Sequence, residues 1–211
     1  MADITSNTAQ GTLFVISAPS GAGKTSLVKA LVESCDDIKV SVSHTTRDAR
    51  PGEVDGVHYN FVDSDTFQEM IGRATFLEHA QVFDNYYGTC GDWVSKQLSK
   101  GIDVILEIDW QGAQQVRKMM PECLSIFILP PSRQALEQRL KGRGQDNDEI
   151  IARRMRDAIN EITHYSEFDY LIINDNFDTA LAELGSVILS QRLRMLPQQQ
   201  RNEQLLDNLL S

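Results

Sequence analysis

The glycine-rich run SAPSGAGKT is the strongest chemical signal in the sequence. It follows an apolar stretch typical of a buried strand and opens a segment of helical period, which is the context of a phosphate-binding P-loop. Gly21 and Gly23 would let backbone N–H groups face an anion, and the helix N-terminus adds a partial positive charge. Lys24 would reach the β- and γ-phosphates of a nucleoside triphosphate, and the Thr25 hydroxyl would bind Mg²⁺. The run therefore predicts a nucleotide-binding site.

The motifs that define two classes of nucleotide-binding protein are absent from this sequence. A guanine-nucleotide switch needs an N/TKxD tetrapeptide to bind its base, and no lysine of this sequence stands in one. A protein kinase needs HRD and DFG segments, and both are missing. These absences exclude both classes.

Two arginines form a second polar constellation after the next predicted strand. Arg47 and Arg50 stand three residues apart, with Ser43 and Tyr59 as hydrogen-bonding neighbours, and such a pair can hold a phosphate in bidentate fashion. On its own this segment fits a solvated turn with two surface arginines better than a phosphate site. Beside a P-loop, it indicates a phosphoryl-transfer enzyme with two nucleotide substrates.

The elements that must position these motifs alternate along the chain. Apolar runs predict strands over 12–17, 40–43, 102–109, 125–130 and 169–174, and helical periods cover 24–34, 111–120, 133–141, 150–162 and 179–196. Most of the strands are continuously apolar, as in strands covered on both faces. The prediction is an α/β fold with a doubly wound parallel sheet. Short aromatic runs between about 47 and 99 predict a small mixed insertion.

Length, charge and cysteine content narrow the class of protein. With 211 residues, one compact domain carrying an insertion is expected, since a typical domain has roughly 150 residues. The net charge of −10 argues against a nucleic-acid or anionic-membrane binder. Three cysteines fit neither a disulfide framework nor a metal clamp, and the N-terminus lacks signal-peptide features, so a cytoplasmic protein is expected. Residues 1–10 are expected to be a disordered leader, and 197–211 a polar tail that is either a short docking helix or frayed.

Six motifs in one order carry a family resemblance. The runs APSGAGKT, TTRDARPGEVDGVHYNFV, FLEHAQVFDNYYGT, EIDWQGAQQV, FILPPS and LKGRG make the sequence similar to the guanylate kinase family, especially its bacterial members, over roughly 11–196. The resemblance implies a P-loop core over 11–46 and 91–196, a GMP-binding insertion over 47–90 and a helical lid over 133–156. It also implies Mg²⁺-dependent transfer of the γ-phosphoryl group of ATP to GMP, giving ADP and GDP in purine metabolism, and leaves the use of dGMP open.

The resemblance also implies roles for single residues. Lys24, Arg139, Arg143 and Arg154 would be catalytic, and the ATP site would comprise Ser20, Gly21, Ala22, Gly23, Lys24, Thr25, Ser26 and Asn174. The GMP site would comprise Ser43, Arg47, Arg50, Tyr59, Glu78, Tyr87, Thr89, Glu107 and Asp109, with Glu78 and Thr89 at the guanine edge. Thr25 would bind Mg²⁺, with Asp109 acting through water. Glu107 stands where many relatives have Asp, which leaves direct and water-mediated guanine contact both open.

Two alternative functions and the oligomeric state stay open at this level. One alternative is a nucleoside monophosphate kinase of other base specificity, which Glu78 disfavours because its carboxylate would meet the N1 lone pair of adenine. The other is a non-catalytic guanylate-kinase-like scaffold domain, which the intact Lys24 and Thr25 disfavour. The LLDNLL stripe in the tail suggests a homo-oligomer.

Overall fold

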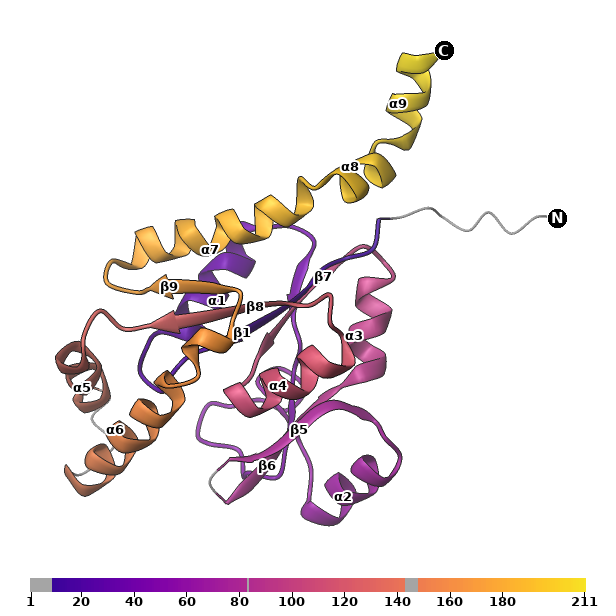
Figure 1. Ribbon diagram of the computed structural model, residues 1–211. Helices are drawn as coiled ribbons and strands as arrows, with labels where there is room; N and C mark the ends of the chain where they lie inside the picture. Colours follow the sequence, from indigo (N-terminus) through magenta and orange to yellow (C-terminus); the bar gives the residue numbers. More distant parts are fainter. Residues whose placement is uncertain (1–8, 83, 143–147) are drawn as a thin grey trace.

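The computed structural model describes residues 9–82, 84–142 and 148–211 and contains a parallel five-stranded sheet (Figure 1). Its order is β2-β7-β1-β8-β9. The bounds are β1 (Leu13–Ser17), β2 (Ile38–Val40), β7 (Asp103–Glu107), β8 (Leu124–Leu129) and β9 (Tyr170–Ile173). Every neighbouring pair in this sheet is parallel. The predicted doubly wound α/β fold is confirmed.

Alternate residues of β1 build the two halves of the core. Phe14 and Ile16 pack on one face with α1 (Lys24–Ser34) and α7 (Phe177–Arg192). Leu13 and Val15 pack on the other face with α3 (Gly91–Leu98) and α4 (Trp110–Met119). Because successive side chains of a strand point to opposite faces, a strand covered on both sides reads as a continuous apolar run.

A smaller mixed sheet follows the second strand. Its order is β4-β3-β6-β5, with β3 (His44–Thr45), β4 (Asn60–Phe61), β5 (Phe76–Val82) and β6 (Asn85–Cys90). Phe67 of α2 (Ser64–Gly72) stacks on Phe76 with ring centroids 4.6 Å apart. The Gln115 side chain of α4 donates to the backbone carbonyl of His79 at 2.7 Å and accepts from its N–H at 3.1 Å. This pair of bonds fixes β5 to α4, which packs on the main sheet.

Two helices form the segment expected as the lid. α5 (Arg133–Lys141) and α6 (Asp148–Ile162) lie side by side at the left of Figure 1 and share an apolar cluster of Leu136, Leu140 and Ala158. The Ser132 hydroxyl caps α5 by accepting from the Ala135 N–H at 3.0 Å. A short 3₁₀ turn, η1 (Tyr165–Glu167), leads from α6 to β9.

The two chain ends differ from the sequence expectations. Of the expected leader, residues 1–8 lie outside the described residues, but Ala9 is buried, so the packed chain includes at least this residue. The helix expected over 179–196 ends at Arg192, since Pro197 lacks the N–H that a continuous helix would require. α8 (Met195–Arg201) and α9 (Glu203–Leu210) follow and project away from the main body (Figure 1). The tail is therefore helical and exposed.

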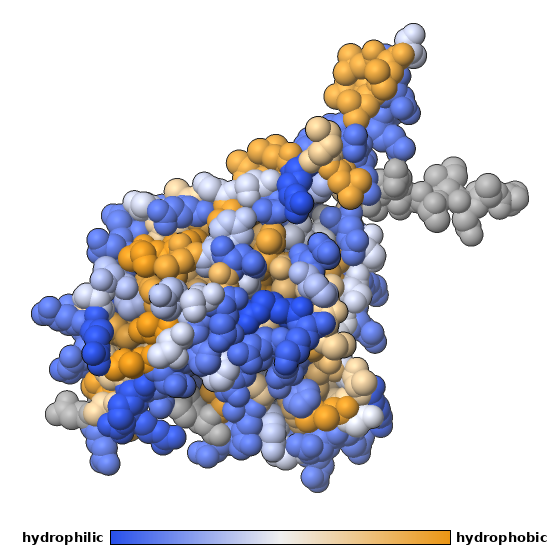
Figure 2. Space-filling view, in the orientation of Figure 1, coloured by the Kyte–Doolittle hydropathy of each residue, from blue (hydrophilic) through white to orange (hydrophobic). Residues whose placement is uncertain are grey.

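Apolar side chains collect on the projecting tail. Figure 2 shows them at the C-terminal end, where Leu205, Leu206, Leu209 and Leu210 are exposed. None of the helices in the described part of the chain combines the length and apolar character needed to cross a membrane.

Candidate active site

A cavity of ≈ 350 Å³ lies where β1 and β7 end and the second sheet begins. The predicted site residues on its wall are Ser20, Gly21, Gly23, Lys24, Thr25, Ser26, Ser43, Tyr59, Glu78, Tyr87, Glu107 and Asp109. In a parallel sheet, ligands bind beyond the carboxyl ends of the strands, so this position follows from the topology. The cavity thus brings the P-loop and most of the predicted GMP residues together.

The P-loop has the backbone shape that its glycines allow. Gly21 and Gly23 adopt φ angles of 93° and 96°, a left-handed region that disfavours residues with a Cβ atom. Gly23 caps α1 directly, and its carbonyl accepts from the Leu27 N–H at 3.1 Å. Lys24 Nζ donates to the carbonyl of Ile108 at 3.3 Å, which holds the ammonium group beside the end of β7. These contacts place the N-terminus of α1, which can bind an anion, and the Lys24 ammonium group at the same cavity.

Carboxylates from β7 and the residues after it face the P-loop. Thr25 Oγ1 donates to Glu107 Oε2 at 3.0 Å. Asp109 caps α4 by accepting from the Gly112 N–H at 2.9 Å, and it also lines the cavity. Among the described residues there is no cluster of three or more His, Cys, Asp or Glu suited to a metal. A hydroxyl with one or two carboxylates fits Mg²⁺, which keeps several waters and takes its other ligands from phosphates.

The pair expected to read guanine is assembled across two strands. Glu78 of β5 lies opposite Thr89 of β6, and Thr89 Oγ1 donates to Glu78 Oε1 at 2.6 Å. Both side chains are buried. The pKa of Glu78 is raised to about 7, mainly by burial; the Thr89 hydrogen bond opposes the rise and the nearby Asp109 charge adds to it. The Glu78 carboxylate is therefore poised between charged and neutral forms near neutral pH.

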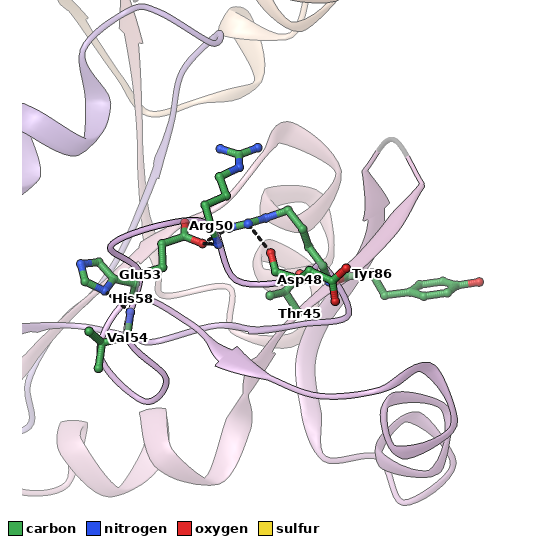
Figure 3. Close-up of polar contacts among 8 residues, drawn as sticks. Thr45, Asp48, Arg50, Glu53, Val54, His58 and Tyr86 are labelled. Carbon is green, nitrogen blue, oxygen red and sulfur yellow. Dashed lines mark hydrogen bonds and ion pairs between the residues drawn. The ribbon is translucent and has the colours of Figure 1, made fainter. Parts of the chain in front are cut away.

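The two arginines expected at the GMP phosphate lie outside the cavity wall. Nη2 of Arg47 donates to both Oε1 and Oε2 of Glu53, at 2.8 and 2.9 Å, and the Arg47 guanidinium lies 5.4 Å from the centre of the Tyr59 ring. The Arg50 backbone N–H donates to the same Glu53 carboxylate at 2.7 Å, while the Arg50 side chain extends away from it (Figure 3). Sequence reasoning missed Glu53, although its spacing from both arginines was visible.

The remaining predicted contacts have mixed positions. Asn174 and Arg139 do not line the cavity; both donate to the backbone carbonyl of Ala22, from Nδ2 at 2.7 Å and from Nη1 at 3.3 Å. Arg154 lies on α6 and is half-buried. Arg143 lies outside the described residues.

Glu161 is a cavity residue that the sequence analysis did not single out. It lies near the end of α6, and its buried Oε2 has no hydrogen-bond partner among the residues that the structure describes. Burial raises its pKa to about 7, with Lys24 opposing the rise and Asp109 adding to it. No motif marks Glu161 in the sequence, since only the folding of α6 against the P-loop brings it to the site.

Comparison with known proteins decides the family. The sequence model of the family "Guanylate kinase" matches residues 10–191. The chain belongs to the guanylate kinase family. Curated guanylate kinases of Escherichia coli K12 and Salmonella typhimurium LT2 are each 58% identical to it over 205 residues, covering 96% of this chain and 99% of theirs. The crystal structure of guanylate kinase from Anaplasma phagocytophilum aligns with a TM-score of 0.75 at 31% identity, covering 90% of each chain.

Membership in the guanylate kinase family fixes the reaction. The chain is an ATP:GMP phosphotransferase, with ATP and GMP as its substrates, as the sequence motifs predicted. The 58% identity to curated guanylate kinases disfavours the alternative of a non-catalytic scaffold domain. The residue roles and the domain boundaries stay predictions.

Proposed function

We propose that the chain binds Mg·ATP on the P-loop and GMP on the second sheet. The cavity between the P-loop and the second sheet then brings the two substrates together for phosphoryl transfer. The observation that supports this division is the cavity itself, whose wall includes Lys24 and Thr25 on one side and Glu78 and Tyr87 on the other. Phosphoryl transfer depends mainly on positioning and charge neutralisation, which two converging half-sites provide.

For the ATP half, we propose that the P-loop residues 20–26 bind the phosphates. Lys24 would neutralise charge on the transferring group, and Thr25, with Glu107 and Asp109 acting directly or through water, would hold Mg²⁺. Bound there, Mg²⁺ neutralises phosphate charge. Arg139, Arg143 and Arg154 are the proposed cationic contacts to the transition state, because positive charge near the transferring group stabilises it.

For the GMP half, we propose that Glu78 and Thr89 select the base. Guanine presents N1–H and N2–H₂ as adjacent donors, and an ionised carboxylate accepts from both. Adenine has a lone pair at N1, which the Glu78 carboxylate would repel, so AMP is disfavoured. Ser43, Arg47, Arg50, Tyr59 and Tyr87 are proposed to hold the GMP phosphate, with Glu53 fixing the orientation of Arg47.

The chemical step needs no general base from the protein. A phosphate oxygen of GMP is already ionised near neutral pH and serves as the nucleophile, so the chain has only to bring it in line with the γ-phosphoryl group. We further propose that dGMP is accepted, and that the enzyme acts in purine nucleotide metabolism in the cytoplasm without nucleic-acid or membrane partners. The acidic net charge of −10 supports the last point.

The test is ADP formation from ATP with GMP, dGMP, AMP, CMP or UMP as acceptor, with a control lacking any acceptor. Turnover with GMP and dGMP that stops when EDTA removes Mg²⁺ is the expected result. Equal turnover with AMP would overturn base selection by Glu78. Undiminished turnover in EDTA would overturn the Mg²⁺ site, and turnover with no acceptor would show that phosphoryl transfer is not tied to GMP.

A further inference from the structure

We infer that Asn174 acts on ATP indirectly, by fixing the orientation of the peptide between Ala22 and Gly23 in the P-loop. The inference deepens the proposed function and rests on the proposed binding of the ATP phosphates by that loop. It makes Asn174 a positioning residue rather than a contact of the adenine base.

The side chain of Asn174 meets the P-loop at close range. Its Nδ2 donates to the Ala22 carbonyl at 2.7 Å, in a bond that is fully buried. A Cβ atom added to Gly23 would lie 2.4 Å from the same Nδ2, so the amide packs directly under the loop. Asn174 is buried at the end of β9 and does not line the cavity, whereas Gly23 does.

Because a peptide group is planar, the hydrogen bond from Asn174 to the Ala22 carbonyl also fixes the direction of the Gly23 N–H. The chain has no cis peptide among the described residues, and the C=O and N–H of a trans peptide point in opposite directions. Because Asn174 fixes the Ala22 carbonyl on the side away from the cavity, the Gly23 N–H is presented to the cavity. Backbone N–H groups at this part of a P-loop cradle phosphates. Gly23 has no Cβ to restrict its φ, so the peptide needs an external contact to hold one orientation.

A second contact links the same carbonyl to the lid. Arg139 of α5 donates to the Ala22 carbonyl at 3.3 Å through Nη1 and to the Asn174 carbonyl at 2.8 Å through Nη2. The Asn174 N–H in turn donates to the Leu129 carbonyl at 2.8 Å. Asn174 is thus fixed through its N–H by β8 and through its carbonyl by α5, so its side chain can act as a rigid support for the loop.

The test compares Asn174→Leu and Asn174→Ala with wild type, using ATP and ITP as phosphoryl donors. Leu keeps roughly the shape of Asn without the donor, and Ala removes the side chain without adding bulk. Since both donors carry the same triphosphate, we expect kcat/KM to fall about tenfold with each, the loss expected for one buried hydrogen bond. The KM for GMP should stay within about twofold, because the second sheet does not contact Asn174.

Asn176→Ala is the matched control on the same segment. Its side chain caps α7 by accepting from the Thr179 N–H at 3.0 Å, and its hydrogen bonds in the described part of the chain stay within α7. This variant should lose thermal stability but keep wild-type kcat/KM with both donors. An equal kinetic loss in the Asn176→Ala and Asn174 variants would reduce the role of Asn174 to general stability and overturn the inference.

Other outcomes overturn it in distinct ways. A loss with ATP that is absent with ITP would assign Asn174 to the adenine base, and unchanged kinetics with both donors would remove any role toward ATP. If Ala and Leu prevent folding, Asn174→Ser keeps a polar group at this position but is too short to replace Nδ2 at the Ala22 carbonyl, and the comparison of kcat/KM for ATP and ITP in this variant tests the inference instead. Absence of ATP-to-GMP transfer in the wild type would refute the proposed function itself, separately from Asn174.

Discussion

Thr89 donates its hydroxyl hydrogen to Glu78 Oε1 at 2.6 Å across neighbouring strands, and Glu78 lines the cavity. The second oxygen of the same carboxylate lies against the first turn of α4, where a Cβ atom on Gly112 would be only 2.7 Å from Oε2. Both carboxylate oxygens of Glu78 are therefore positioned by neighbours, one by a donor and one by the space that glycine leaves.

Substituting Gly112 with alanine should separate function from stability. The new Cβ would displace the Glu78 carboxylate and raise the KM for GMP by about tenfold, a change worth about 1.4 kcal/mol. Alanine is about 1 kcal/mol more favourable than glycine in a helix, so the melting temperature should hold or rise. Steady-state kinetics and thermal unfolding on the same preparation measure both effects.

Gly185→Ala provides the matched control for Gly112→Ala. Gly185 lies in α7, where an added Cβ would meet only Leu31 at the ordinary contact distance of 3.9 Å. This substitution should stabilise the protein and leave the KM for GMP unchanged. If both glycine variants raise that KM alike, the effect does not arise at Glu78.

GMP binding should depend on pH through Glu78. Its pKa is raised to about 7, mainly by burial, so below pH 7 the carboxyl group is increasingly protonated and accepts poorly from guanine. The affinity for GMP should fall by up to about tenfold per pH unit below pH 7, with proton release on binding. Calorimetric titrations in buffers of different ionisation enthalpy measure both quantities.

Glu78→Gln is the control for this pH dependence. The phosphate of GMP also titrates near pH 6, and the Gln variant retains that contribution while losing the carboxyl group. The variant should bind GMP more weakly at pH 8 and show a flatter pH profile than wild type. Identical profiles in the two proteins would assign the pH dependence to the phosphate alone.

Removing the P-loop cation should stop the reaction. We expect Lys24→Ala to lower kcat by about a thousandfold, because the charge on the transferring phosphoryl group loses a fixed cation. The matched control is Lys29→Ala, on the exposed face of the same helix, where the lysine pairs loosely with Glu33 at 3.9 Å. Kinetics for the Lys29 variant should match wild type, and comparable losses in both would refute the role of Lys24.

Glu161 should make the stability of the protein depend on pH. Its folded pKa of about 7 lies above the ordinary value of 4.5, so between these values only the unfolded state ionises. This contribution to the free energy of unfolding is therefore complete below pH 4.5, is lost as pH rises to about 7, and changes no further. Glu161→Gln should be increasingly more stable than wild type across that window in urea titrations, whereas Glu183→Gln on α7 should follow wild type.

The tail should control self-association if its leucines are an interface. Deleting residues 197–211 removes the exposed apolar stripe of α9 and leaves the main sheet intact. Light scattering coupled to size-exclusion chromatography should give a smaller subunit number for the truncated chain than for the full chain. The same number for both would exclude the tail as the interface.

Local signals were enough to predict the P-loop and four of the five strands of the main sheet, whereas the strand expected over 40–43 lies at Ile38–Val40. The run from Ser17 to Thr25 lies between a buried strand and α1, so one short segment carries both the turn and its phosphate-binding groups. The boundaries of α1 and α5 were predicted correctly because helix caps and helical periodicity depend on residues that are close together in the sequence. The roles of Glu78 and Thr89 came from resemblance, not from any local pattern.

Tertiary structure decided the contacts between segments far apart in the chain. Asn174 meets Ala22 across 152 positions, and Glu161 reaches the cavity only because α6 packs beside the P-loop. A lone Asn or Glu has no periodicity to reveal its partner. The sequence determined which elements form, since hydrogen bonding and apolar period are local, whereas the burial and electrostatics of single polar groups depend on which elements pack together.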